Sequence, residues 1–483
     1  MKRTTVIISI LVLALAAAAT PWVIGWRTEQ LVRARVAQVE ADPTAKIRLQ
    51  IDRYERGWRG ANARINVVDR AGTPLITLPA AIRHWPFASG GPADWVAVPE
   101  LGTPVRDALG PWAEKLPDLT TRTQLSWDGN VLTRIESPAF KRRVPEVAGG
   151  FLEIAAISGT VDWRRDGRLT YELALPVFRV EQRAISRAAD APDAAEFKEA
   201  VIKGDGSLGT IERRWNQKGS LTAASVSVIE AGKTILSATA PLISYASVDE
   251  GEHVGMQFSV AASAISAKHA LQSFSEATIE LALDARHIAK EPLGRLLDAA
   301  AMATTPSGVG TPTPGMPGRA ATSEPPSSEL FDAVLRASPA ADLRFMLKAR
   351  EGRVEIKLAL AFDGQGYDPK ISSSSSWLQR LDAELNARAS TALVMSGARA
   401  GASMAAGMMR PGGPAGNLSA PPDVPSPDDA IARQQLAEAA AQGWIRIEGD
   451  EVAATLVWRK GGLTINGKDM SALRDLAQGM IAR

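Results

Sequence analysis

The sequence contains no cysteine. This absence excludes disulfide bonds, zinc sites built on thiolates, iron–sulfur clusters and cysteine nucleophiles. Histidine is scarce, and none of the four has another histidine at i+3 or i+4: His84, His253, His269 and His287. We therefore predict surface or packed histidines and expect no metal, no cofactor and no catalytic residue.

An excess of charge of one sign is also missing. The 483 residues carry 55 Lys and Arg against 53 Asp and Glu, which gives a formal net charge of +2. Nucleic-acid binding needs a concentrated basic surface, so we expect no nucleic-acid partner. With 45% hydrophobic and 22% charged residues, the composition is that of a globular chain with a sizeable core.

A long apolar run occurs only at the N-terminus. The uncharged stretch from Thr4 to Trp26 would form a helix about 34 Å long, enough to cross a hydrocarbon core of about 30 Å. The basic pair Lys2-Arg3 predicts a cytoplasmic N-terminus, with Trp22 and Trp26 at the far membrane interface.

The alternative for this stretch is a cleaved signal peptide. Its apolar part would run from Val6 to Ala19, with cleavage before Thr20. We favour the signal-anchor because the apolar character continues through Val23 and Ile24.

The rest of the chain alternates apolar and polar residues, as in Ile47, Leu49 and Ile51, which is typical of half-buried strands. Hairpin dipeptides recur at 128–129, 166–167, 205–206, 363–364, 461–462 and 466–467. The predicted fold class is mainly β with helices (α+β). It comprises an N-terminal transmembrane helix and an extended antiparallel sheet of hairpins, with helices concentrated in the C-terminal half, including one from Trp377 to Leu393.

Changes in composition predict the boundaries between segments. Stretches rich in Pro, Gly, Ser and Ala read as flexible linkers, and a stalk helix follows the anchor. The predicted order is a signal-anchor (1–26), a stalk helix (27–42), a β-rich body (43–300), a flexible linker (301–328), a second body segment of helix, strands and helix (329–395), a flexible segment (396–427), and a C-terminal helix, β-hairpins and terminal helix (428–483).

Two short motifs flank the body: Tyr54-Glu55-Arg56-Gly57-Trp58 near its start and Gly462-Leu463-Thr464-Ile465-Asn466-Gly467-Lys468 near its end. In these motifs the chain resembles the YdgA-like family of uncharacterised bacterial proteins. The resemblance implies an inner-membrane, single-pass envelope protein with its body in the periplasm, and it carries over no catalytic residue. We interpret the motif positions as structural: Tyr54, Arg56, Gly57 and Trp58 as a turn in which Gly57 is left-handed and the two aromatic rings pack together, and Asn466-Gly467 as a type I′ turn.

The string Gly204-Asp205-Gly206-Ser207-Leu208-Gly209 matches a dinucleotide-binding fingerprint in its letters. No helix is predicted after it, and phosphates need a helix N-terminus at that point, so we predict no nucleotide site.

These observations favour a non-enzymatic, membrane-anchored envelope protein that binds a lipid or another apolar molecule along one sheet face. The alternative is an envelope assembly or scaffold protein that acts through a protein partner or as a homo-oligomer. A hydrolase with dispersed carboxylates stays open as a third hypothesis, since such a pair leaves no local signature.

Overall fold

The computed structural model describes residues 22–470 except 38, 40–47, 59, 70, 85–90, 145–149, 183–192, 208–215, 231, 269–272, 297–326, 369–375 and 396–426. Positions 1–21 of the predicted anchor, most of both predicted flexible segments and the predicted terminal helix lie outside the described residues. Within the described part of the chain, no helix combines the length and the apolar character needed to span a membrane. The chain falls into two compact units, Met1–Ala246 and Ser247–Arg483.

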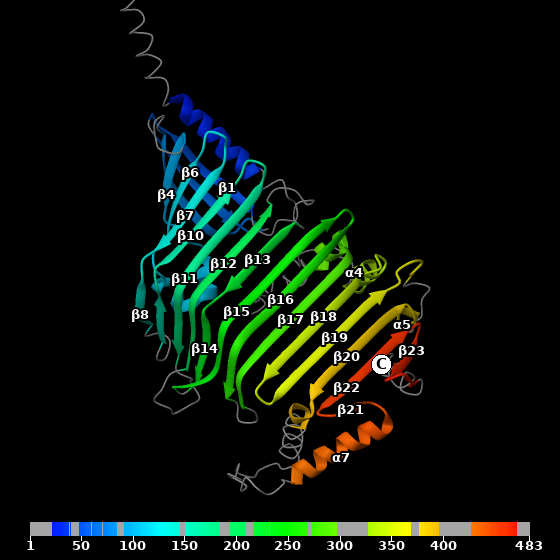
Figure 1. Ribbon diagram of the computed structural model, residues 1–483. Coiled ribbons are helices and arrows are strands. Elements are labelled where there is room, and N and C mark those ends of the chain that lie inside the picture. The colour runs from blue at the N-terminus through cyan, green and yellow to red at the C-terminus, as the bar shows by residue number, and fades with distance from the viewer. Residues whose placement is uncertain are drawn as a thin grey trace, which may run out of the picture. The chain divides into compact units, whose positions relative to one another are not determined.

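The first unit is an antiparallel sheet with a few helical segments (Figure 1). The strands are β1 (Arg48–Arg56), β2 (Gly60–Val68), β3 (Pro74–His84), β4 (Ala93–Ala97), β5 (Glu100–Leu101), β6 (Thr120–Leu125), β7 (Val131–Ser137), β8 (Phe140–Val144), β9 (Gly150–Ile154), β10 (Ile157–Trp163), β11 (Arg168–Gln182), β12 (Asp193–Ser207), β13 (Gln217–Thr222), β14 (Ser225–Glu230) and β15 (Lys233–Glu250), the last of which contains the boundary between the units. The helical segments are residues 22–37, α2 (Thr103–Leu109) and the 3-10 helix η1 (Gly110–Lys115).

Pairing in this unit runs β1–β2–β3–β4–β6–β7–β10–β11–β12, and β5 also pairs with β3. The two long strands each pair with two short ones: β11 with β10 and β9, and β12 with β13 and β14. The predicted strands around residues 47–52 and 61–67 are confirmed as β1 and β2, because alternation at period two matches a pleated strand with one buried face.

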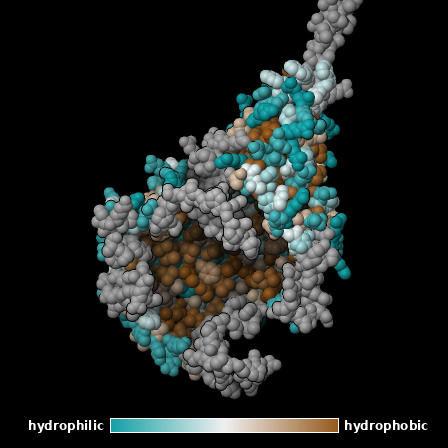
Figure 2. All heavy atoms as spheres, turned by 180° about the vertical axis from the view of Figure 1, so that it is seen from behind, coloured by the Kyte–Doolittle hydropathy of each residue, from teal (hydrophilic) through white to brown (hydrophobic). Residues whose placement is uncertain are grey.

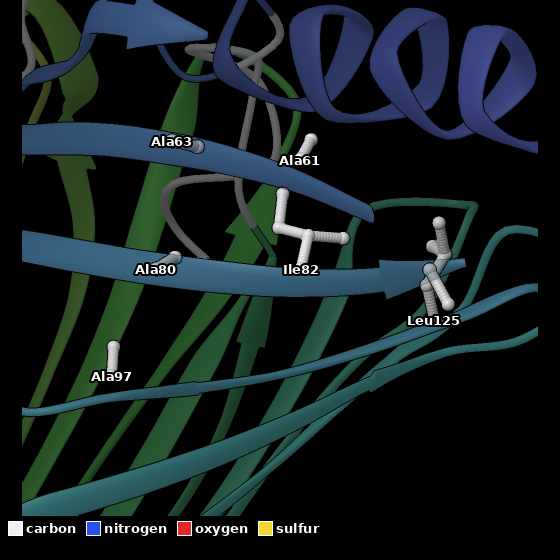
Figure 3. Close-up of a cluster of buried hydrophobic side chains, with 7 residues drawn as sticks. Ala61, Ala63, Ala80, Ile82, Ala97 and Leu125 are labelled. Atoms are coloured by element: carbon white, nitrogen blue, oxygen red, sulfur yellow. The ribbon is translucent and has the colours of Figure 1, made fainter. Parts of the chain in front are cut away.

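The core of the first unit lies between the helix over residues 22–37 and the sheet. Ile24, Thr28, Val32 and Val36 are buried on one face of that helix, at the spacing of successive helical turns. They cover a cluster of buried residues from β2, β3, β4 and β6, and Ala61 points toward the helix (Figure 3): Ala61, Ala63, Ala80, Ile82, Ala93, Ala97 and Leu125. Five of these seven side chains are alanine, so the helix can approach the strands closely.

The second unit contains a series of antiparallel strands that pair in the order β16–β17–β18–β19–β20–β22–β23–β24, with β21 paired to the start of β22. The bounds are β16 (His253–Lys268), β17 (Ser273–Ala289), β18 (Ala340–Ala349), β19 (Gly352–Phe362), β20 (Leu381–Ser390), β21 (Arg446–Glu448), β22 (Glu451–Arg459), β23 (Gly462–Ile465) and β24 (Lys468–Asp469). Its helices are α4 (Ser327–Leu335), α5 (Ser376–Gln379), α7 (Pro427–Gln442) and residues 290–296 and 391–395.

The mainly β, antiparallel character is confirmed, but the predicted placement of helices is wrong in two respects. Helices are not concentrated in the C-terminal half, because residues 22–37 and the segment Thr103–Lys115 are helical in the first unit. The helix predicted from Trp377 to Leu393 is mostly the strand β20. Leu381 and Leu385 are four residues apart, which fits both one helical turn and two strand repeats, and alternation with Asp382 and Glu384 decides for the strand.

Candidate functional site

One face of the second unit's sheet is apolar from strand to strand. In β19, Val354, Ile356, Leu358 and Leu360 alternate with charged residues or alanine, so the apolar side chains share one face. The same alternation occurs in β17, β18, β20 and β22. Figure 2 shows hydrophobic residues gathered in a hollow over these strands.

The register of the strands aligns these residues into continuous rows. Directly paired residues lie on the same face of a sheet, so a row can be followed from one pairing to the next. The central row is Phe258, Leu283, Leu343, Leu358, Leu385, Leu456 and Ile465; beside it lie Val260, Leu281, Phe345, Ile356, Ala387 and Ala454 on one side and Met256, Ala285, Ala341, Leu360, Ala383, Trp458 and Leu463 on the other. We call these three rows the open face.

The open face is only partly covered. Phe258 is 39% exposed, and Leu283, Leu343 and Leu358 are half-buried although they lie in interior strands. In the first unit the helix-covered Leu125 is 1% exposed. A sheet face normally needs a second layer, so this degree of exposure marks a surface that can accept an apolar ligand or partner.

The opposite face of the same strands is polar and internally paired. Arg286 forms an ion pair with Asp342, and the Arg353 guanidinium lies 2.6 Å from the Glu451 carboxylate. The Thr455 hydroxyl donates to the Asn386 side-chain oxygen at 2.9 Å. The sheet therefore has one solvated face and one apolar face.

Strands of the first unit repeat this pattern on a smaller scale. Val180, Ala195, Val228 and Leu236 form one row across β11, β12, β14 and β15, and Leu236 is 39% exposed. The ring of Phe178 contacts that of Phe197 edge-on, with centroids 6.3 Å apart, in the neighbouring row. Leu236 is thus an exposed apolar side chain in this row, whereas Phe178 and Val180 pack against a buried cluster of Phe140, Leu152 and Ile154.

The motif around Tyr54 holds the helix against the sheet. Arg56 places its guanidinium 3.6 Å from the Glu29 carboxylate and 5.2 Å from the ring centroid of Trp22, both on the helix over residues 22–37. Tyr54 packs against the closed core, and burial, aided by the Glu29 charge, raises its pKa to about 12. The guanidinium carbon of Arg33 also lies 6.0 Å from the Tyr54 ring centroid.

Two details of this motif differ from the prediction. Gly57 does not have a positive φ; its N–H donates to the Gly60 carbonyl at 2.7 Å, and a Cβ would lie 3.2 Å from that oxygen. Trp58 is 55% exposed, whereas Tyr54 faces the core, so the two rings do not share an environment. The close approach of the Gly60 carbonyl, rather than a left-handed backbone conformation, explains why position 57 is a glycine.

A buried histidine lies beside the motif, which is the packed alternative of the prediction for this residue. His84, at the end of β3, is 0% exposed, and a Cβ on Gly25 of the helix would lie 2.7 Å from its Nδ1. Neither ring nitrogen has a hydrogen-bond partner among the described residues. Burial, together with the Arg56 charge, lowers the pKa of His84, so the ring is neutral at neutral pH.

The family model described as "Bacterial protein of unknown function (DUF945)" matches residues 1–472. The chain belongs to this family. No curated protein and no solved structure matches the chain.

The tail motif of this DUF945 chain links the turn after β23 to β22 and to the segment before β21 through hydrogen bonds of Asn466. Asn466 has φ +51° and Gly467 φ +80°, which are the left-handed conformations of the turn between β23 and β24. The Asn466 side chain accepts from the Thr455 N–H at 2.9 Å and donates to the Gly443 carbonyl at 2.9 Å. Asn466 therefore both forms the turn and connects it to two neighbouring segments through its side chain.

The other predicted positions are not among the residues of the open face. Trp22 and Trp26, the predicted membrane-interface residues, are each 50% exposed on the first unit's helix. The fingerprint residue Gly204 lies inside β12, where a Cβ would be 2.3 Å from the Tyr171 ring. Among the described residues no group of three His, Asp or Glu side chains could hold a metal ion. His253 and His287 do meet, with ring centroids 5.9 Å apart, through a strand pairing that their sequence spacing does not reveal.

Proposed function

We propose that this protein is a non-enzymatic, membrane-anchored protein of the bacterial envelope that binds lipid acyl chains on the open face. The observation that carries the proposal is the partial exposure of most side chains in three continuous apolar rows, which contain no charged side chain. Burying apolar surface contributes about 25 cal/mol per Å², so covering such a face is strongly favourable.

The dimensions of the face suit acyl chains. Neighbouring strands lie about 4.8 Å apart, so the central row from β16 to β23 is about 29 Å long. One leaflet contributes about half of a hydrocarbon core of about 30 Å, so an extended acyl chain fits along the row. The polar headgroup can remain in water at the edge of the sheet because the face is not enclosed.

The alternative occupant of the open face is protein, either an envelope partner or a second copy of the chain. This arrangement would make the protein a scaffold or a homo-oligomer, with the same apolar rows buried in an interface. This alternative predicts that the protein associates with its partner or with itself through the apolar rows of the open face, and that this association persists after lipid is removed.

Lipid analysis of matched variants separates these occupants. Leu358→Lys places a charge on the open face, whereas Ala359→Lys places the same charge on the polar face, opposite Asp342 and Glu384. We expect mass spectrometry of the purified protein to find phospholipid with the wild type and with Ala359→Lys, and at least several-fold less with Leu358→Lys. Wild-type protein purified without bound lipid would refute the proposal. An oligomer that forms with the wild type and with Ala359→Lys but not with Leu358→Lys would support a protein partner instead.

The anchor, the single-pass topology with a periplasmic body and the narrower YdgA-like grouping belong to the same proposal. Their support is the uncharged stretch from Thr4 to Trp26 and the two motifs. The test fuses to the C-terminus a reporter enzyme that is active only in the periplasm. We expect the reporter to be active and the fusion protein to sediment in the membrane fraction. Release into the soluble fraction would instead support the cleaved signal peptide.

A further inference from the structure

A cavity lies in the first unit, on the sheet surface beside α2 and η1. Its volume is about 1100 Å³. Ligand pockets commonly measure about 300 to 1,000 Å³, so this cavity has room for a ligand of at least that size. Its lining residues all belong to the first unit, and it plays no part in the function proposed above.

The floor of this cavity is apolar. It is formed by strand residues of β2, β3, β9 and β10 together with the segment after η1: Val67, Ile76, Leu78, Ile154, Ile157 and Leu119. Although α2 adjoins this floor, it has no buried residue, and Leu109 and Leu116 near its C-terminal side are 36% and 37% exposed. The segment thus lies beside an apolar floor without filling it.

The rim of the cavity carries charge of both signs, with carboxylates in excess. Glu100 is ion-paired with Arg64 at 3.3 Å. Among the described lining residues, the remaining carboxylates are exposed and outnumber the guanidinium groups: Asp107, Glu114 and Asp118, against Arg106.

We propose that this cavity binds a single-chain zwitterionic amphiphile whose head carries an ammonium and a phosphate. The hydrocarbon chain lies on the apolar floor. The ammonium faces the carboxylates of Asp107, Glu114 and Asp118, and the phosphate pairs with the Arg106 guanidinium. An exposed ion pair contributes about 0.2 to 1 kcal/mol, so three carboxylates are expected to favour an ethanolamine head over an uncharged one by about 10-fold.

The test measures binding of the full-length protein to three probes: lysophosphatidylethanolamine, lysophosphatidylglycerol of the same chain length, and glycerophosphoethanolamine, which has no chain. We expect the first to bind about 10-fold more tightly than the second, and the third not to bind. Equal affinities for the two lysolipids, or binding of the chainless probe, would overturn the proposal.

Two sets of variants locate the site. Ala113 lines the cavity and Ala108 of α2 does not, so Ala113→Trp should abolish binding of both lysolipids while Ala108→Trp leaves it unchanged. The triple variant Asp107→Asn, Glu114→Gln, Asp118→Asn changes only exposed side chains and should reduce the preference to about 2-fold or less. Unchanged binding by Ala113→Trp, or an unchanged preference in the triple variant, would place the amphiphile elsewhere. Because Leu358→Lys does not touch this cavity, failure here leaves the open-face proposal standing, and the converse also holds.

Discussion

Arg56 of β1 contacts the helix over residues 22–37 at two points: its guanidinium is 3.6 Å from the Glu29 carboxylate and 5.2 Å from the Trp22 ring centroid. The side chains of Arg56 and Glu29 are only 27% and 19% exposed, so solvent screens this pair less than an ion pair on the open surface. The motif residue thus joins the first strand to the helix that closes the core.

Arg56→Gln should therefore loosen the helix. We expect a loss of about 1 to 2 kcal/mol in the free energy of unfolding, measured by urea denaturation. Arg53→Gln is the control, because Arg53 is 69% exposed and pairs with the exposed Glu55 on the same strand; it should cost less than about 0.5 kcal/mol. Equal effects of the two variants would contradict the role assigned to Arg56.

His84 should make the stability of the first unit depend on pH. The pKa of an unfolded histidine is about 6.5, and burial lowers that of His84 in the folded state. Between these two values the unfolded chain binds a proton that the folded chain does not, so the free energy of unfolding falls as the pH drops below about 6.5. Above that pH the contribution is constant.

His84→Leu removes this titration. Between pH 7 and pH 5 we expect the slope of unfolding free energy against pH to decrease by up to about 1.4 kcal/mol per pH unit. An identical slope in wild type and His84→Leu would show that the ring is not buried in its neutral form.

Gly204 makes room for an aromatic ring. A Cβ at this position would lie 2.3 Å from Tyr171 Cζ, so Gly204→Ala should destabilise the protein by about 1 to 3 kcal/mol through overpacking. In the same strand, Gly206→Ala would place its Cβ 3.2 Å from the flexible side chain of Gln217 and should cost less than about 1 kcal/mol. Thermal unfolding of the two variants checks the difference, which would vanish if Tyr171 did not cover Gly204.

Leu358→Lys should test directly whether the open face is accessible in the lipid-free protein. On a half-exposed face the ammonium can reach water, so we expect a loss of about 1 kcal/mol or less. Leu125→Lys, in the closed core, should cost more than about 3 kcal/mol. Comparable losses in delipidated protein would mean that the rows around Leu358 are covered.

Asn466 combines a left-handed backbone with two side-chain hydrogen bonds. Asn466→Ala loses both bonds and strains the turn, for an expected cost of about 2 to 3 kcal/mol. Asn466→Gly loses the bonds but accepts the positive φ, so it should be about 1 kcal/mol less destabilising than Asn466→Ala. Urea denaturation of both variants checks this order, and the reverse order would contradict it.

Local patterns predicted the hairpins well where turn geometry decides the structure. Gly129 and Gly167 have φ of +89° and +90° in the turns that their Asp-Gly dipeptides indicate. The hairpin predicted from the same dipeptide at 205–206 is wrong. Asp205 forms an ion pair with Arg168 of the neighbouring strand, and both residues of the dipeptide lie within β12. A two-residue signal does not contain the cross-strand partner that keeps a strand extended.

Long-range relationships were not predictable from spacing. The apolar run that predicts a membrane segment continues into a helix whose residues Ile24 and Val32 pack on the sheet, since a buried helix face and a membrane helix share the same composition. Likewise, alternation predicted an apolar side for strands such as β1, β2 and β10, but the degree of exposure of that side depends on which elements cover it. That coverage is a property of the tertiary structure.

The rows of the second unit run across the strands, so their length depends on the number of hairpins. Each added hairpin extends a row by two strand spacings, about 10 Å, without altering the residues already in place. The unit is in this sense modular, because a hairpin added at the edge of the sheet enlarges the apolar area. Enlarging an enclosed pocket would instead require changes in the residues that already line it. Gain or loss of hairpins during evolution would thus lengthen or shorten the apolar track while preserving its width and its polar reverse side.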